Sequence, residues 1–216
     1  MRKQIILLLV LLCGGFAPFA AAQKKSDLSG WATADLVLNH KRWDITTSLE
    51  YRSKENIGAT DLFSIGQYGR YTFSPLFKVS LGYELFFTHT DSRGTILEHR
   101  LMAQNESSLR IRNFRIDNRL SLLDDFEKIN DPAMGFRDRI RVKYPVKRFE
   151  PFTYIELYYR FKPHTLLHHK NRYGAGVNYT VSSQSIFTLY YMCEQYFQKD
   201  FTNNVCGISY AYTLPI

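Results

Sequence analysis

Apolar and polar residues alternate along most of the chain after residue 42. Residues 43–52, WDITTSLEYR, place Trp43 and Ile45 on one face and Asp44 and Glu50 on the other. Because every second side chain of a β-strand shares a face, this period predicts strands. The alternation is clear in 43–52, 77–87, 136–144, 171–181 and 204–214, and weaker in 62–73, 97–111, 114–123, 151–161 and 185–197. No segment after residue 22 has a convincing helical period, so the sequence predicts an all-β fold.

The segment 97–111 alternates least well. Asn105 and Ser107 fall on the face that should be apolar. A β-bulge inserts one residue and moves the following side chains to the other face. We therefore predict a bulge or a change of register within this segment.

The length and chemistry of the predicted strands favour a membrane barrel. The segments have about 10–12 residues, whereas strands of globular proteins usually have about 5–6. Charges are closely spaced on the polar faces, and Tyr and Phe concentrate near the ends of the apolar faces. These features are typical of a closed antiparallel transmembrane β-barrel with an apolar outer band, a polar interior and aromatic girdles. An exported soluble sandwich or lipocalin-like barrel is the alternative.

The spacing of turns predicts about ten strands between Trp43 and Leu214, with twelve as the alternative. Shorter connections, expected to be periplasmic, alternate with longer ones, expected to be extracellular. An even count places both ends of the barrel on the periplasmic side. Trp31–Asn39 also has a strand-like pattern, but an eleventh strand would begin on the other side. We therefore expect residues 23–42 to form an N-terminal extension that enters the lumen or caps the barrel, and residues 43–216 to form the barrel.

The first 22 residues have the layout of a secretory signal peptide. Arg2 and Lys3 precede the apolar run from Ile5 to Leu12, and the small residues Ala20–Ala22 offer a cleavage site. The run is too short to span a bilayer. We expect cleavage after Ala22 and location in the outer membrane; a lipoprotein signal at Cys13 is the alternative.

Several short motifs are distributed over nearly the whole chain after the signal. They are Trp31, Glu50-Tyr51-Arg52, Gly82-Tyr83, Glu98-His99-Arg100, Phe136-Arg137-Asp138-Arg139, Pro151-Phe152 and Arg172-Tyr173-Gly174-Ala175-Gly176. In this spacing the chain resembles a family of small Gram-negative outer-membrane β-barrel proteins whose function is unknown. The resemblance implies fold and location and no activity. Gly207, Tyr210, Tyr212 and Leu214 also resemble the C-terminal signal read by the barrel-assembly machinery, an expected partner during insertion together with outer-membrane lipid.

The polar faces of the predicted strands collect a network of charges. The candidate lumen cations are Arg115, Arg119, Arg137, Arg139, Arg141, Lys143 and Arg172, and the candidate lumen carboxylates are Glu50, Glu84, Glu98, Asp117 and Glu156. Arginine–carboxylate pairs would fill and stiffen a narrow lumen. An unneutralised row of cations would instead attract small anionic solutes, in a pocket or a narrow anion-preferring pore. Export and inward placement argue against nucleic acid as the partner of this chain, whose net charge is +8.

The remaining candidate chemistry is weak, and we expect no enzyme activity, no metal and no cofactor. Residues that could act in a lipid- or peptide-modifying enzyme lie in the predicted connections: His89, Asp91, Ser92, Asp124, Asp125, His164, His168, His169 and Ser185. Their spacing matches no catalytic signature, and His164, His168 and His169 lack a carboxylate that would complete a metal site.

Cys193 and Cys206 are predicted to face outward on the last two strands. If the hairpin between them is centred between Lys199 and Asp200, the two residues are direct cross-strand neighbours. They are then either two small apolar residues facing lipid or a strained disulfide.

Overall fold

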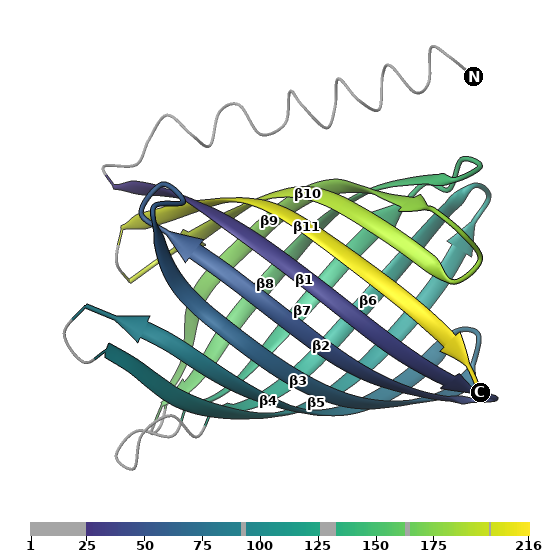
Figure 1. Ribbon diagram of the computed structural model, residues 1–216, viewed down its shortest axis with the longest axis horizontal. Coiled ribbons are helices and arrows are strands. Elements are labelled where there is room, and N and C mark those ends of the chain that lie inside the picture. Colours follow the sequence, from purple (N-terminus) through teal and green to yellow (C-terminus); the bar gives the residue numbers. More distant parts are fainter. Residues whose placement is uncertain (1–24, 92–93, 126–132, 163–164, 199) are drawn as a thin grey trace.

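The protein is a closed β-barrel of eleven strands (Figure 1). A computed structural model describes residues 25–91, 94–125, 133–162, 165–198 and 200–216. The strands are β1 (Ser26–His40), β2 (Trp43–Lys54), β3 (Ala59–Ser74), β4 (Phe77–Thr90), β5 (Gly94–Ile111), β6 (Phe114–Asp125), β7 (Ala133–Lys143), β8 (Phe149–Lys162), β9 (Thr165–Thr180), β10 (Ser185–Tyr196) and β11 (Phe201–Pro215). No helix in this described part of the chain is both long and apolar enough to span a membrane. The predicted signal peptide, residues 1–22, lies outside the described residues.

The count of eleven corrects the prediction of ten strands and its alternative of twelve. The segment 23–42, predicted to be an extension, contains β1, which belongs to the barrel wall. β1 pairs antiparallel with β2 and parallel with β11, where Trp31 lies opposite Gly207. A barrel with an odd number of strands closes through one parallel pair, and the prediction of an even number did not consider such a pair.

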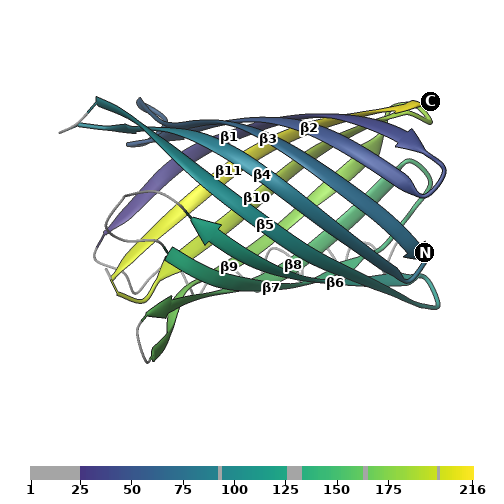
Figure 2. The same cartoon turned by 90° about the horizontal axis from the view of Figure 1, so that it is seen from below.

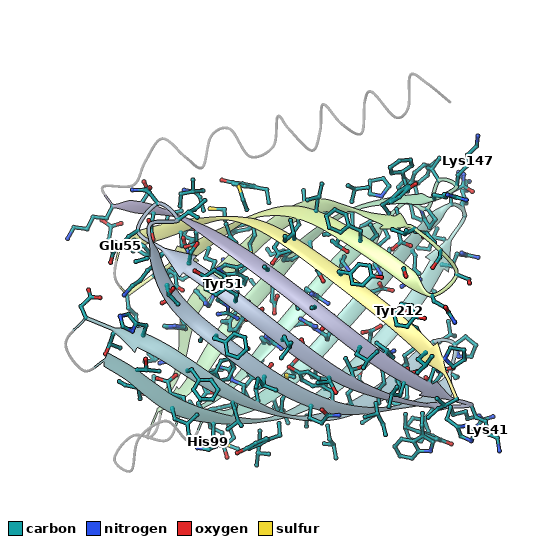
Figure 3. All side chains as sticks on the ribbon, in the orientation of Figure 1. Lys41, Tyr51, Glu55, His99, Lys147 and Tyr212 are labelled. Carbon is teal, nitrogen blue, oxygen red and sulfur yellow. The ribbon has the colours of Figure 1, made fainter. Side chains whose placement is uncertain are left out.

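The two rims of the barrel differ. The connections after β1, β3, β5, β7 and β9, which begin at residues 41, 75, 112, 144 and 181, lie at one end, here called the turn rim. The connections after β2, β4, β6, β8 and β10 lie at the other end, here called the loop rim. Figure 3 places Lys41 and Lys147 at the turn rim and Glu55 at the loop rim. The odd count puts Ser26 at the loop rim and Pro215 at the turn rim (Figures 1 and 2). The predicted alternation of shorter and longer connections holds only in the first half of the chain: the turn-rim connection between β7 and β8, residues 144–148, is longer than the loop-rim connection between β8 and β9, residues 163–164.

The barrel is apolar outside and polar inside. Large exposed apolar side chains include Leu81 and Leu122, at 67% and 54% exposure. The buried set instead contains Asp117, Glu156 and Glu194 among its polar members. Figure 3 shows side chains projecting from the whole outer wall. The alternation predicted from the sequence therefore describes the two faces of the wall correctly.

Aromatic side chains gather near both rims. At the turn rim, Trp43 and Tyr71 have ring centroids 4.8 Å apart, and Phe149 lies 5.0 Å from Tyr179. At the loop rim, the rings of Phe136 and Tyr159 stack at 4.8 Å, and Phe136 lies 6.0 Å from Phe161. Two such belts are typical of the water-facing edges of a membrane barrel.

Inside the wall, tyrosine rings lie over glycines of the neighbouring strand. Tyr68 is paired with Gly82, Tyr154 with Gly174, and Tyr190 with Gly207. A Cβ added at Gly207 would lie 2.0 Å from the Tyr190 ring. The glycines therefore make room for rings that cover the strand backbone, as aromatic residues do over glycine in other sheets.

The predicted pairing of the two cysteines is wrong by two residues. Cys193 lies opposite Asn204, and Cys206 lies opposite Tyr191. Because Tyr196 pairs with Phe201, the hairpin is centred one residue earlier than expected. Both cysteines are free. They are diagonal neighbours on the outer face, and such positions are about 7–8 Å apart, beyond ordinary disulfide reach.

The irregularity predicted for 97–111 is also absent. β5 pairs with β4 and β6 without a shift in register. Shifts occur instead at Arg52/Ser53 and Thr72/Ser74 in the pairs of β3, and at Tyr158/Tyr159 between β8 and β9. Asn105 and Ser107 therefore remain on the outer face of a regular strand.

Candidate functional site

A polar cavity of about 390 Å³ occupies the lumen. It is lined by seven arginines, Arg52, Arg100, Arg119, Arg137, Arg139, Arg141 and Arg172, and by four carboxylates, Asp35, Glu50, Glu84 and Glu156. We call it the arginine chamber. A smaller cavity of about 110 Å³ lies on the loop-rim side and shares Arg52, Arg100, Arg137 and Arg172 with it. These four arginines therefore stand between the two cavities.

The wall formed by β6 and β7 carries the highest density of cations. Arg137, Arg139 and Arg141 face inward because they occupy every second position of β7. Arg119 of β6 lies directly opposite Arg139 in the register. Like charges at directly opposed positions are unfavourable in a sheet. This arrangement therefore has to be offset by negative charge from elsewhere.

Glu156 of the adjacent strand β8 forms ion pairs with two arginines of this wall. Its Oε1 lies 3.7 Å from Arg119 Nη2 and 3.6 Å from Arg137 Nε, which are ion-pair distances beyond good hydrogen bonds. Glu156 Oε1 has no hydrogen-bond partner among the described residues. The same holds for the buried Nε atoms of Arg119, Arg137 and Arg141. Such unsatisfied buried groups are uncommon in native proteins and mark a site where a further partner fits.

Arg139 and Arg141 are weakly neutralised. Within the described ranges Arg139 forms no ion pair; its guanidinium lies 5.7 Å from the Tyr154 ring. Arg141 lies 3.5 Å from Asp117, but that carboxylate is shared with other cations. Asp117 is 3.0 Å from Arg115 and 3.0 Å from Lys143. The predicted cluster is thus divided: Arg115 and Lys143 are held by Asp117 toward the turn rim, and the chamber arginines remain in excess.

The partition between the two cavities is densely bonded. Arg172 donates from Nε to Glu194 at 2.5 Å and from Nη1 to Tyr158. Two guanidinium groups contact the Trp31 ring, with Arg52 4.0 Å and Arg172 5.1 Å from its centroid. These cation–π contacts help to hold the ring in the lumen.

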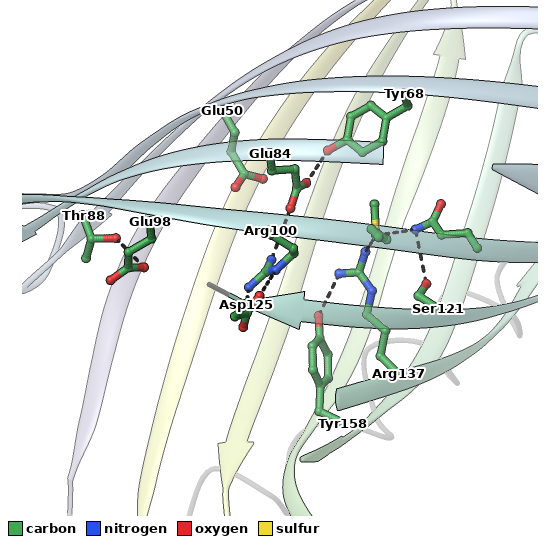
Figure 4. A network of polar contacts seen from close by, with 12 residues as sticks. Glu50, Tyr68, Glu84, Thr88, Glu98, Arg100, Ser121, Asp125, Arg137 and Tyr158 are labelled. Carbon is green, nitrogen blue, oxygen red and sulfur yellow. Dashed lines mark hydrogen bonds and ion pairs between the residues drawn. The ribbon is translucent and has the colours of Figure 1, made fainter. Parts of the chain in front are cut away.

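A second network of polar contacts lies on the inner face of the wall (Figure 4). Arg100 bonds to Asp125 and lies 3.3 Å from Glu84. Arg137 Nη1 donates to Tyr158 at 3.2 Å. These bonds join adjacent strands along the inner wall, β4 to β5 and β5 to β6, and β7 to β8. Most of the charged side chains in this part of the lumen, on the loop-rim side, therefore have a bonded partner.

The other predicted carboxylates have local roles. Glu50 pairs with Arg52 at 2.5 Å on the same strand. Glu98 accepts a hydrogen bond from Thr88 at 3.2 Å, near the loop rim. The sequence analysis missed Trp31, because residues 23–42 were assigned to an extension. It also missed the inward tyrosines, for which the opposed glycines were an available signal.

The candidate catalytic residues are not brought together. Asp125 is bonded to Arg100, and Ser185 lies at the turn rim, 3.1 Å from Tyr210. His168 stacks on Tyr159, with ring centroids 4.8 Å apart. Ser92 and His164 lie outside the described residues. Over the described ranges, no group of three metal-binding side chains is found.

Comparisons with known proteins place the chain in a family. No curated protein matches it. Among solved structures, the chain is similar to the beta domain of the Bordetella autotransporter Brka, with 11% identity over 82% of this chain and 86% of that chain and a TM-score of 0.48. The model of a family described as "Protein of unknown function (DUF2490)" matches residues 30–205. This confirms the resemblance to a family of unknown function, and the chain belongs to the DUF2490 family.

Proposed function

We propose that this chain is an integral outer-membrane β-barrel whose arginine chamber binds a small oxyanion without acting on it chemically. The main observation that supports oxyanion binding is the excess of buried, incompletely bonded guanidinium groups around Glu156, inside a cavity of about 390 Å³. That volume falls within the range of small-molecule sites, about 300–1,000 Å³.

The distribution of polarity supports the membrane placement. Large apolar side chains cover the outside, and aromatic belts lie near both rims. A closed barrel leaves no unpaired strand edge in lipid. A soluble barrel would gain nothing from exposing this surface to water. The N-terminal signal expected from the sequence is consistent with export to the outer membrane.

The chemistry of the chamber favours an oxyanion. Guanidinium groups present several N–H donors in a plane, which suits carboxylate, sulfate or phosphate oxygens. Arg119 and Arg139 are directly opposed, so an anion between them would relieve their repulsion. It would also accept from nitrogens that have no partner in the described chain.

A narrow anion-preferring pore is the second candidate. The two cavities on either side of the arginine partition favour it, because they lie along one lumen. The bonded partition around Trp31 favours binding without free passage. Planar-bilayer conductance separates the two functions: we expect no steady current, and an anion-selective current would establish the pore instead.

Fluorescence of Trp31 provides a direct binding test. The chain has two tryptophans, and Trp43 lies outside, 54% exposed. In a Trp43→Phe background, titration with inorganic phosphate at constant ionic strength should change Trp31 emission saturably. Arg139→Gln should weaken this response at least tenfold. Arg110→Gln, which changes an inward arginine outside the chamber lining, should not. An equal response in both variants, or none in the parent, rejects the proposal.

A further inference from the structure

A group of polar residues interrupts the apolar outer face of the barrel. It consists of Asn105 and Ser107 on β5, Asn118 on β6 and Asp138 on β7, and we call it the polar island. All four side chains face outward, because each residue lies two positions along its strand from another outward residue. Exposed outward neighbours are Leu109 at 55%, Leu122 at 54% and Ile140 at 47%. The island is thus bounded along the strands by apolar side chains.

The polar residues of the island lie around Leu120, which is opposite both Asn105 and Asp138 in the register. Ser107 lies directly opposite Asn118 in the register, and Ser107 Oγ donates to Asn105 Oδ1 at 3.3 Å. Asn118 Nδ2 donates to Asp138 Oδ1 at 2.6 Å. The structure gives no ion pair to Asp138 within the described ranges. The carboxylate therefore has a neutral amide beside it and no neighbouring cation.

The depth of Asp138 makes the island costly in lipid. β7 runs from Ala133 to Lys143, so Asp138 lies at its midpoint. Ionisable residues at the middle of a membrane are unfavourable and usually have a partner. Hydrocarbon tails offer no donor to this carboxylate. By contrast, Thr47 and Gln67 on the wall formed by β2 and β3 are neutral and bond to each other at 2.9 Å.

We propose that the polar island is the contact surface for a second copy of this chain. The island contains a carboxylate acceptor together with the amide and hydroxyl donors of Asn105, Asn118 and Ser107, so it is complementary to itself. A two-fold axis brings residue i of one copy to residue j of the other and the reverse. Across such an axis, the donors on β5 of each copy face Asp138 of its partner. The surrounding leucines and Ile140 form the apolar rim of the contact.

This inference rests on the proposed membrane placement and is independent of anion binding. If the purified chain is soluble without detergent, the membrane placement fails. If it needs detergent and is monomeric at every concentration, the placement stands and the dimer is rejected.

Disulfide crosslinking in membranes tests the geometry. Leu120 lies on β6, opposite both Asn105 and Asp138, and is therefore the outward residue nearest to the two-fold axis. In a Cys193→Ser, Cys206→Ser background, Leu120→Cys should yield an oxidised dimer of the chain. Thr47→Cys, an outward mid-strand position on a different wall, is the matched control and should not. Equal crosslinking of the two variants, or capture of a different protein by Leu120→Cys, overturns the proposal.

Removal of the island's polarity tests the energetics. Asn118→Leu with Asp138→Leu should keep the barrel folded, as judged by heat-modifiable gel migration, because both changes suit a lipid-facing surface. The dimer dissociation constant in detergent should rise about tenfold, the change expected from losing a polar contact within a membrane. The control pair Thr47→Leu with Gln67→Leu should leave it unchanged. An unchanged constant in the island variant rejects the proposed contact.

Discussion

Replacement of Glu156 by Gln tests whether the chamber arginines need negative charge. The change keeps the shape of the side chain and removes its charge. Arg172 retains Glu194, and Arg137 retains the Tyr158 hydroxyl. Arg119 loses its ion-pair partner, and Arg139 lies opposite it with none within the described ranges. Glu156→Gln therefore leaves two opposed cations without compensation.

The distances give the magnitude. Two charges 4 Å apart interact by about 4 kcal/mol at an effective dielectric constant of about 20. Removing one partner of a buried pair typically costs about 3–5 kcal/mol. The pairs with Glu156 are long, 3.6 and 3.7 Å, and the arginine side chains are 13% and 21% exposed. We therefore expect the lower end, about 3 kcal/mol.

An oxyanion in the chamber should restore most of this loss. A ligand at one hundred times its dissociation constant stabilises the folded state by about 2.7 kcal/mol. In chloride, Glu156→Gln should lower the unfolding midpoint by roughly 6–12 °C, as read from heat-modifiable gel migration in detergent. Added inorganic phosphate should recover most of the difference and should stabilise the native protein less.

Glu98→Gln is the matched control, since Glu98 lies in the lumen but outside the chamber lining. Phosphate should raise the unfolding midpoint of Glu98→Gln no more than it raises the midpoint of the native protein. A Glu156→Gln midpoint equal to that of the native protein in chloride would show that the arginines do not depend on this carboxylate. A lower midpoint that phosphate leaves unchanged would refute oxyanion binding.

Three further predictions follow from the wall and the partition. Cysteines introduced at Asn56 and at Ser182, in the Cys193→Ser, Cys206→Ser background, should be labelled by impermeant reagents from opposite sides of the membrane, and same-side labelling would contradict the rim assignment. Gly207→Ala should destabilise the barrel by about 1–3 kcal/mol through the Tyr190 ring, whereas Gly69→Ala, with open space at its Cβ, should not; unfolding midpoints compare them. Trp31→Ala should open a conducting path in planar bilayers, because it removes the ring that contacts Arg52 and Arg172 of the partition, and an unchanged absence of current would show that the charged groups suffice to block the lumen.

Local patterns in the sequence predicted the wall and the direction of its side chains. The period of two placed Arg137, Arg139 and Arg141 inward and Ile140 outward, as the structure has them. This succeeds because alternation is a property of each strand alone. The candidate cations and Glu156 were identified for the same reason. Their division between Asp117 and the chamber was not predictable, because it depends on contacts between strands.

Features set by pairing between strands were the ones missed. The cysteine register depended on the centre of one hairpin, and a shift of that centre by one residue moved each partner by two. Asn105 and Ser107 of the polar island were interpreted as signs of a bulge because an apolar outer face was assumed to be unbroken. The regular register of β5 keeps Asn105 and Ser107 on that face, so the irregularity lies in the chemistry of the surface and not in the backbone.

The unexpected strand β1 connects the topology to the site. Its inward positions bring Trp31 and Asp35 to the chamber, and its parallel pairing with β11 sets Trp31 against Gly207. The absence of a side chain at Gly207 leaves room for Tyr190, which packs with Trp31 in the interior cluster. Trp31 in turn contacts Arg52 and Arg172, which line both cavities. A barrel of ten strands beginning at Trp43 would lack this ring. The strand that closes the wall therefore also supplies a side chain that contacts the arginine partition of the lumen.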